Sequence, residues 1–172
     1  MKTRADDNLG YWLFYSQRSV AYAFSEVLRQ FCLKYKKPYI ITPSQWGVLS
    51  LLFETGEITI GAISQRRGVD APTITGIVKR LEQSGLVERV HDRGDRRVVK
   101  VSLTDEGKSI MDSLSEQVDA FNDILTHGLS EAEQSDFRTN LQRIIANVSV
   151  VAPGTGDRFG LLPHEFHCDE PE

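Results

Sequence analysis

The stretch IVKRLEQSGLVERVHDRGDRRVVKVSLTDEG, residues 77–107, decides the fold. It opens inside an apolar helical pattern, and Gly85 is typical of the residue after a helix end. Two β-branched runs follow, LVERV at 86–90 and RVVKVSL at 97–103, and the second alternates apolar and polar side chains. The charged stretch HDRGDRR, residues 91–97, joins them. This order predicts a helix followed by a β-hairpin with a basic tip.

Upstream of the hairpin, the sequence predicts two short helices joined by a turn. The first carries Ile60 and Ile63 and ends near Gly68, and the second covers residues 71–84 with Asp70 as its N-cap. The second helix has apolar residues at helical spacing, namely Ile74, Ile77, Val78 and Leu81. Two helices around a glycine-containing turn are typical of a helix-turn-helix. A hairpin directly after the second helix makes it a winged helix-turn-helix.

Long amphipathic helices are predicted on both sides of this core. Residues 9–36 read as one helix, and Thr42, Pro43 and Gln45 are expected to begin another whose buried stripe is Trp46, Leu49, Leu52 and Phe53. After the hairpin, Thr104 and the Ser130–Glu133 pair are expected to cap two more helices. The predicted fold class is mainly α with a small β wing.

Four segments follow from these patterns. Residues 1–42 are expected to hold an N-terminal dimerisation helix, 43–103 the winged helix-turn-helix, 104–151 C-terminal dimerisation helices, and 152–172 an irregular tail. The apolar stripes outside the winged helix exceed what one small domain needs, and a two-fold dimer can bury the surplus.

Charge is distributed unevenly along the 172 residues, whose formal net charge is −4. Residues 60–103 carry 9 Lys and Arg against 5 Asp and Glu, whereas residues 104–172 carry 4 against 14. A basic segment in an acidic chain suits a polyanionic partner, and a solvated basic face is the alternative. The two cysteines are far apart in sequence, and the N-terminus lacks the apolar run of a secretory signal. A cytoplasmic protein without a membrane span is therefore expected.

The pieces RLEQSGLVER, DRGDRR and VSLTDEG resemble the winged-helix core of the multiple-antibiotic-resistance regulator (MarR) family. The resemblance extends over roughly residues 9–148 and is most specific in the wing. It implies a homodimeric transcription regulator, more often a repressor than an activator, that binds a pseudo-palindromic double-stranded DNA operator. It also implies that the first and the last two helices form the dimer interface.

The predicted DNA contacts fall into three groups. The second helix of the motif would point its outward residues at the major groove; these are Pro72, Thr73, Thr75, Gly76, Lys79 and Arg80. The wing would reach a minor groove with Arg93, Arg96 and Arg97, one of them oriented by Asp95. Gln65 and Arg66, with Arg67, end the preceding helix and are candidates for phosphate contacts. The alternative for each residue is a solvated surface.

A small-molecule effector is a further expectation, since the resemblance implies release from DNA by phenolic or carboxylate ligands, thiol oxidation or metals. Aromatic residues with one arginine could form an apolar pocket with an anion-fixing group; the candidates are Tyr11, Tyr15, Arg18, Tyr22 and Trp46. Trp46 could instead belong to the core. Cys32 is a redox candidate because lysines lie close by in sequence, or a small buried residue.

Enzymatic chemistry is not expected. The chain has no G-x-x-x-x-G-K-[ST], H-E-x-x-H or G-x-S-x-G motif, and no cofactor is predicted. HEFHC in the tail, with His164, His167 and Cys168, lacks a paired ligand set, so no metal site is predicted. Two other binding classes stay open: a non-specific architectural DNA binder, and a winged helix used only for protein contacts.

Overall fold

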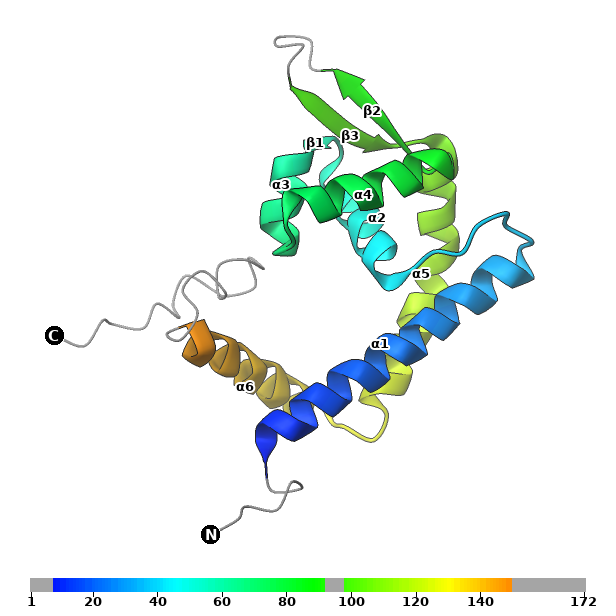
Figure 1. Ribbon diagram of the computed structural model, residues 1–172. Coiled ribbons are helices and arrows are strands. Elements are labelled where there is room, and N and C mark those ends of the chain that lie inside the picture. Colours follow the sequence, from blue (N-terminus) through cyan, green and yellow to red (C-terminus); the bar gives the residue numbers. More distant parts are fainter. Residues whose placement is uncertain (1–7, 92–97, 150–172) are drawn as a thin grey trace, which may run out of the picture.

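The computed structural model describes residues 8–91 and 98–149. Its helices are α1 (Leu9–Lys34), α2 (Pro43–Thr55), α3 (Ile60–Arg67), α4 (Ala71–Gln83), α5 (Asp105–Thr126) and α6 (Glu131–Ser149). Its strands are β1 (Ile58–Thr59), β2 (Val87–His91) and β3 (Val99–Leu103). The strands lie at the top of Figure 1 beside α3 and α4, and α1, α5 and α6 extend below them.

Side-chain caps explain where the helices begin, and they confirm the predicted starts. Thr42 and Gln45 form a reciprocal capping box at α2, with Pro43 in the first turn. Asp70 accepts the backbone N–H of Thr73 at the start of α4, and Thr104 accepts that of Gly107 at the start of α5. Each oxygen satisfies a helix donor that has no partner within the helix. The same reciprocal pattern joins Ser130 and Glu133 before α6.

The sheet has the strand order β1-β3-β2, and both pairings are antiparallel. Val87 pairs with Leu103 and His91 with Val99, which confirms the predicted pair of strands, β2 and β3. The third strand, β1, was not predicted; Ile58 pairs with Val101. Two residues are too short to show an alternating pattern, so β1 is visible only through its partner strand.

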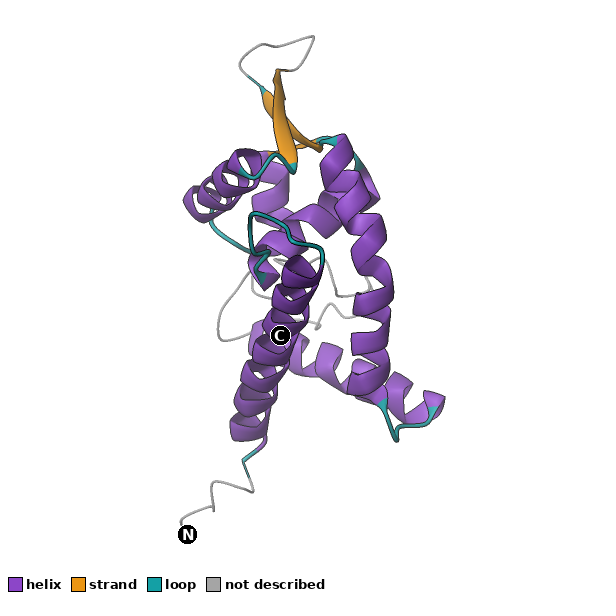
Figure 2. Cartoon of the chain, turned by 90° about the vertical axis from the view of Figure 1, so that its right-hand side faces the viewer, coloured by secondary structure: helices purple, strands orange, loops and turns teal. Residues whose placement is uncertain are grey.

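The main core lies where α2, α3 and α4 meet the sheet and the neighbouring parts of α1 and α5. Its fully buried side chains come from every one of these elements and include Leu28, Leu49, Ile63, Leu81, Val101 and Leu114. α1 continues beyond this core, and in the rotated view its free end points away from the strands (Figure 2). The described helices include none with the length and apolar character needed to span a membrane.

Two predicted details are corrected. α1 ends at Lys34 rather than residue 36, because Lys36 takes a left-handed conformation with φ 49°. Phe53 was expected in the buried stripe of α2, but its side chain is 48% exposed. The buried side of α2 is formed by Val48, Leu49 and Leu52, because α4 and α5 both pack on this side.

The end of α4 is tied to the start of α5. The Thr104 hydroxyl donates to the Gly85 carbonyl over 2.6 Å, and the Thr104 N–H donates to the Leu86 carbonyl over 3.1 Å. Gly107 lies so close to the Leu86 carbonyl that a Cβ atom would overlap it. This junction sets the direction of α4 relative to the long helix α5.

Candidate nucleic-acid interface

The outward face of α4 presents the residues predicted for the major groove. Ile74, Ile77, Val78 and Leu81 are buried on one side of this helix, as predicted. The opposite side exposes Pro72, Thr73, Thr75, Lys79 and Arg80, with Gly76 half-buried among them. Because the buried side anchors α4 to the core, the exposed side is a rigid surface of hydroxyls, methyls and two cations.

The hydroxyls of the two threonines are already used within the helix. Thr73 donates from Oγ1 to Oδ2 of Asp70 over 2.7 Å, and Thr75 donates from Oγ1 to the Ala71 carbonyl over 2.8 Å. The hydrogen bonds from the Thr73 backbone N–H and hydroxyl hold the pKa of Asp70 below its ordinary value. Each threonine oxygen is left as an acceptor, and its methyl group as an apolar contact.

Two cations on α4 are available to a polyanion. Lys79 and Arg80 form no ion pair with any residue in the described ranges 8–91 and 98–149. Arg80 reaches back along the helix, and its Nη1 lies 3.9 Å from where a Cβ atom of Gly76 would be. Because Gly76 has no side chain, the Arg80 guanidinium has room to move across this position.

The end of α3 places Gln65 and Arg66 at the surface, beside α4. Gly68 ends this helix, as the sequence predicted, and takes the left-handed conformation with φ 59°. Arg67 behaves differently, because its guanidinium lies against Gly47 of α2, where a Cβ atom would overlap it. Arg67 therefore connects two helices, whereas Arg66 is exposed and forms no ion pair within the part of the chain that the structure describes.

The base of the wing is held by ion pairs to its neighbours. Arg89 of β2 contacts Glu82 of α4 over 3.2 Å, and Lys100 of β3 contacts Glu57 over 3.3 Å. Neither pair was predicted from the sequence, because each joins residues from different elements. The wing residues predicted to enter a minor groove lie outside the described residues; they are Arg93, Asp95, Arg96 and Arg97.

The aromatic and arginine residues proposed for an effector pocket are not brought together within one chain. Tyr11, Tyr15, Arg18 and Tyr22 share one exposed face of α1, where Arg18 lies over the ring of Phe14 at 5.6 Å. Trp46 lies against the opposite side of α1, with its ring centroid 5.0 Å from that of Phe24. It is half-buried and packs against the core, so the core interpretation of Trp46 also holds.

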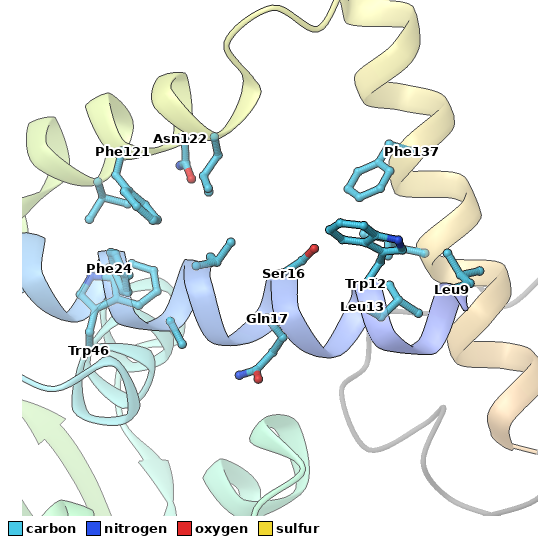
Figure 3. A pocket seen from close by; sticks show the side chains of 15 residues that line it. Leu9, Trp12, Leu13, Ser16, Gln17, Phe24, Trp46, Phe121, Asn122 and Phe137 are labelled. Carbon is cyan, nitrogen blue, oxygen red and sulfur yellow. The ribbon is translucent and has the colours of Figure 1, made fainter. Parts of the chain in front are cut away.

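The structure has a cavity on the Trp46 side of α1, bounded also by α5 and α6 (Figure 3). Its volume is about 670 Å³. Three aromatic lining residues were not predicted from the sequence, namely Phe24, Phe121 and Phe137. A usable signal was present, because Leu9, Leu13, Val20 and Phe24 recur on one face of α1.

The remaining candidates are placed as follows. Cys32 is completely buried in the core and has no disulfide partner among the described residues. In this state it is a packing residue, with no surface for an oxidant to reach. His164, His167 and Cys168 lie outside the described residues, with the rest of the tail from residue 150.

Comparison with known proteins relates the chain to transcription regulators. The model of the MarR family matches residues 41–99. The HTH-type transcriptional regulator YsmB of Bacillus subtilis is 32% identical over 106 residues, which are 62% of this chain and 73% of YsmB. The matched region contains α2, α3, α4 and β2, the elements that form the proposed interface.

Solved structures have the same fold. A crystal structure of a probable transcriptional regulator from Pseudomonas aeruginosa has a TM-score of 0.71 and 31% identity, covering 83% of this chain and 100% of that one. Bordetella bronchiseptica BpsR has a TM-score of 0.68 and 23% identity, covering 79% of this chain and 97% of BpsR. The BpsR structure is described as a mechanism for regulation of its DNA binding by 6-hydroxynicotinic acid.

Proposed function

The chain belongs to the MarR family of transcription regulators, and from this premise we propose that it is a dimeric, sequence-specific repressor released from its operator by a small molecule. One observation carries the DNA-binding part of the proposal. α4 has one side packed into the core, while its other side offers threonine oxygens, methyl groups and two cations that form no ion pair within residues 8–91 and 98–149. Such a helix meets both needs of a recognition helix, a fixed direction and a chemically mixed surface.

The contacts divide by chemistry. Thr73 and Thr75 meet base edges, because their hydroxyl hydrogens are held within α4 and a phosphate offers only acceptors. The phosphates are contacted by Lys79, Arg80 and Arg66, because phosphate oxygens accept hydrogen bonds from both ammonium and guanidinium groups. The arginines of residues 93–97 are assigned to the adjacent minor groove, as the sequence predicts. The ion pair between Arg89 and Glu82 supports this arrangement by fixing the base of the wing to α4.

A second copy of the chain is the proposed partner of the helical half. α1 and α6 expose large apolar side chains, including Trp12 at 53% and Phe137 at 59%. Exposed apolar area of this kind is typical of an interface. A two-fold dimer would cover it and would present two α4 helices to half-sites about one DNA turn, roughly 34–36 Å, apart.

The effector is proposed by analogy with BpsR and because a cavity lies next to the helix that supports the DNA-binding motif. The cavity lies between α1, α5 and α6 on one side and Trp46 of α2 on the other. α2 in turn packs on α3 and α4. A molecule bound there can shift the separation of the two recognition helices, provided that it binds the free and DNA-bound states unequally.

Operator binding is the direct test. The protein is titrated against its own upstream intergenic DNA and against a random duplex of equal length, across a salt series. We expect a preference of about 10³ or more and an affinity that falls as salt rises. Equal affinity for both duplexes would favour an architectural binder, and a genome-wide selection of bound fragments would then show whether any preferred sequence exists.

Three variants separate the roles of the residues. Lys79→Ala should weaken binding to both duplexes and lower the salt slope by about one. Thr75→Ala should instead reduce the preference for the operator over random DNA. Arg143→Ala, which removes a positive charge from α6, is the matched control and should leave both affinities unchanged. Equal losses for Thr75→Ala on the two duplexes would assign Thr75 to the DNA backbone.

A further inference from the structure

The first part of α4 exposes carbon atoms and hydrogen-bond acceptors. Ala71, Pro72, Thr73 and Thr75 are exposed, and Gly76 is half-buried after them. Their side chains contribute the Ala71 methyl, the proline ring and two threonine methyl groups. The polar atoms that remain among these side chains are the two threonine oxygens. This surface is therefore largely apolar, although it belongs to the helix that carries the cations of the motif.

Every side-chain donor on residues 71–76 is already used within the helix. The Thr73 hydroxyl lies 2.7 Å from Oδ2 of Asp70, and the Thr75 hydroxyl lies 2.8 Å from the Ala71 carbonyl. Because a carboxylate and a carbonyl only accept, each hydroxyl must be the donor in its bond, and its free lone pair can only accept. The Thr73 backbone N–H also donates to Asp70, over 2.9 Å.

The charges of α4 lie on either side of this surface. Asp70 carries a negative charge at the start, since the Thr73 backbone N–H and hydroxyl hold the pKa of its carboxyl below the ordinary value. Lys79 lies three residues beyond Gly76, about 4.5 Å further along the helix axis. The Arg80 guanidinium reaches back to the position of Gly76. Residues 71–75 thus form a part of the helix face that is separate from the cationic part.

The major groove offers one base pair that matches such a surface. Thymine presents its 5-methyl group there, and its partner adenine presents the N6 amino group as a donor. Guanine presents two acceptors, N7 and O6, which need donors that residues 71–75 do not supply from their side chains. An A·T pair therefore provides a methyl group for the apolar atoms and a donor for a threonine oxygen.

We propose that residues 71–75 select A·T base pairs in each half-site, by packing the methyl groups of Thr73 and Thr75 against thymine 5-methyl groups. The inference rests on the proposed function, in which α4 is the recognition helix, and it adds which bases that helix reads. A helical threonine can adopt two rotamers, and the bonds to Asp70 and to the Ala71 carbonyl select one for each residue. The methyl groups are thus fixed before DNA binds.

Removal of the thymine methyl groups tests the proposal. The full-length protein first selects its preferred fragment from a random-sequence pool, and this duplex is synthesised once with thymidine and once with deoxyuridine at every thymidine position. We expect the deoxyuridine duplex to bind about tenfold more weakly or worse, because each methyl group lost from a buried contact costs about fourfold in affinity. A random duplex made in both forms should change by less than about twofold, since non-specific binding depends on phosphates.

Two variants of α4 assign the methyl dependence to the threonines. The double variant Thr73→Ser, Thr75→Ser removes both methyl groups and keeps both hydroxyls. We expect it to reduce the affinity ratio between the thymidine and deoxyuridine duplexes to below about threefold. Thr75→Val keeps the methyl group and removes the oxygen, so it should weaken binding to both duplexes and retain the ratio.

Thr139→Ser in α6 is the matched control for the serine variants. Its hydroxyl donates to the Ser135 carbonyl over 3.0 Å, which is the same bond to the fourth preceding residue that Thr75 makes. Thr139 is exposed on a helix outside the winged-helix half. This substitution should therefore leave the affinity ratio unchanged, and circular dichroism checks that every variant keeps its helical content.

Three results would overturn the inference, and they differ in what they retain. Equal affinity for the thymidine and deoxyuridine duplexes would remove the thymine reading and retain a sequence-specific regulator. A methyl dependence that the serine variant keeps in full would assign it to DNA shape rather than to the threonines. A pool that yields no preferred fragment would remove the proposed function itself.

Discussion

The two halves of this molecule treat their apolar side chains differently. In the winged-helix half, Leu49, Ile63 and Leu81 are completely buried by other elements of the same chain. In the helical half, Trp12 and Phe137 are more than half exposed, and Ile124 of α5 is 71% exposed. Both halves were predicted from equally regular apolar stripes. An apolar stripe therefore predicts that a helix face becomes buried, but not what buries it. Only the winged-helix half buries its stripes within a single chain.

The largest expected effect is a loss of stability in the winged-helix half. Leu81→Ala removes a completely buried side chain of α4, and we expect the free energy of unfolding to fall by about 2–5 kcal/mol. Urea unfolding at a fixed protein concentration measures the change. Leu33→Ala, in α1 where the side chain is 52% exposed, is the control and should cost less than about 0.5 kcal/mol. Equal losses for the two variants would contradict the comparison.

The next effect addresses the helical half. Phe137→Asp places a charge on the exposed apolar face of α6, and we expect the dimer dissociation constant to rise about a hundredfold while the helical content is kept. Sedimentation equilibrium measures the constant. Thr139→Asp, which introduces the same charge elsewhere on α6, should leave it nearly unchanged. A constant that Phe137→Asp does not alter would remove this face from the interface.

The junction between the halves gives a smaller effect. A Cβ atom at Gly107 would overlap the Leu86 carbonyl, which is backbone and cannot easily move. We therefore expect Gly107→Ala to lower the free energy of unfolding by about 2 kcal/mol. At Gly61 of α3 a Cβ atom would find its nearest neighbour at 3.9 Å, so Gly61→Ala should be neutral or slightly stabilising. Thermal unfolding of both variants checks the contrast.

The smallest expected effect depends on pH. Lys37 Nζ donates to Glu106 Oε1 over 2.7 Å, and this bond, with a second from Tyr39, holds the pKa of Glu106 below its ordinary value of 4.5. A carboxyl whose pKa is lower in the folded state stabilises the fold above its unfolded pKa, and the contribution is lost as the pH falls through the folded pKa.

Glu106→Gln tests this sign. Because the Glu106 side chain is 49% exposed, solvent screening limits the pair to about 0.5 kcal/mol. The difference in unfolding free energy between parent and variant should be present at pH 7 and should shrink as the pH falls below 4.5. A difference that stays constant through the acid range would assign the effect to packing. Burial and the neighbouring Glu106 charge raise the pKa of Tyr39, so its hydroxyl donates throughout this range.

Local features of the fold were predictable from neighbouring residues alone. The caps at Thr42, Asp70 and Thr104, and the helix end at Gly68, depend on near neighbours in the sequence, and the structure confirms each of them. The presence of β2 and β3 followed equally from β-branched and alternating patterns on either side of a short connection, and their register comes from the structure. The exposed face of α4 was predicted because its buried face was unambiguous.

Relations between distant segments were less accessible. β1 became a strand only because β3 lies beside it, and Phe53 is exposed because α4 and α5 pack on another side of α2. The aromatic residues of α1 were grouped by type, whereas the structure separates them by face. Helical spacing shows that a face exists but does not identify the element that covers it.

By itself the sequence determined the helices α1 to α6, the strands β2 and β3, the helix caps, the basic wing segment and the side of α4 that points outward, because these depend on local periodicity and on hydrogen bonds to near neighbours. Only the tertiary structure decided which face of α1 borders a cavity, that the Trp46 Nε1 donor is buried without a partner among the described residues, and that Arg67 lies against Gly47. The physical reason is that burial and orphaned hydrogen-bond groups arise where elements meet, and these meetings are set by packing of segments far apart in the chain.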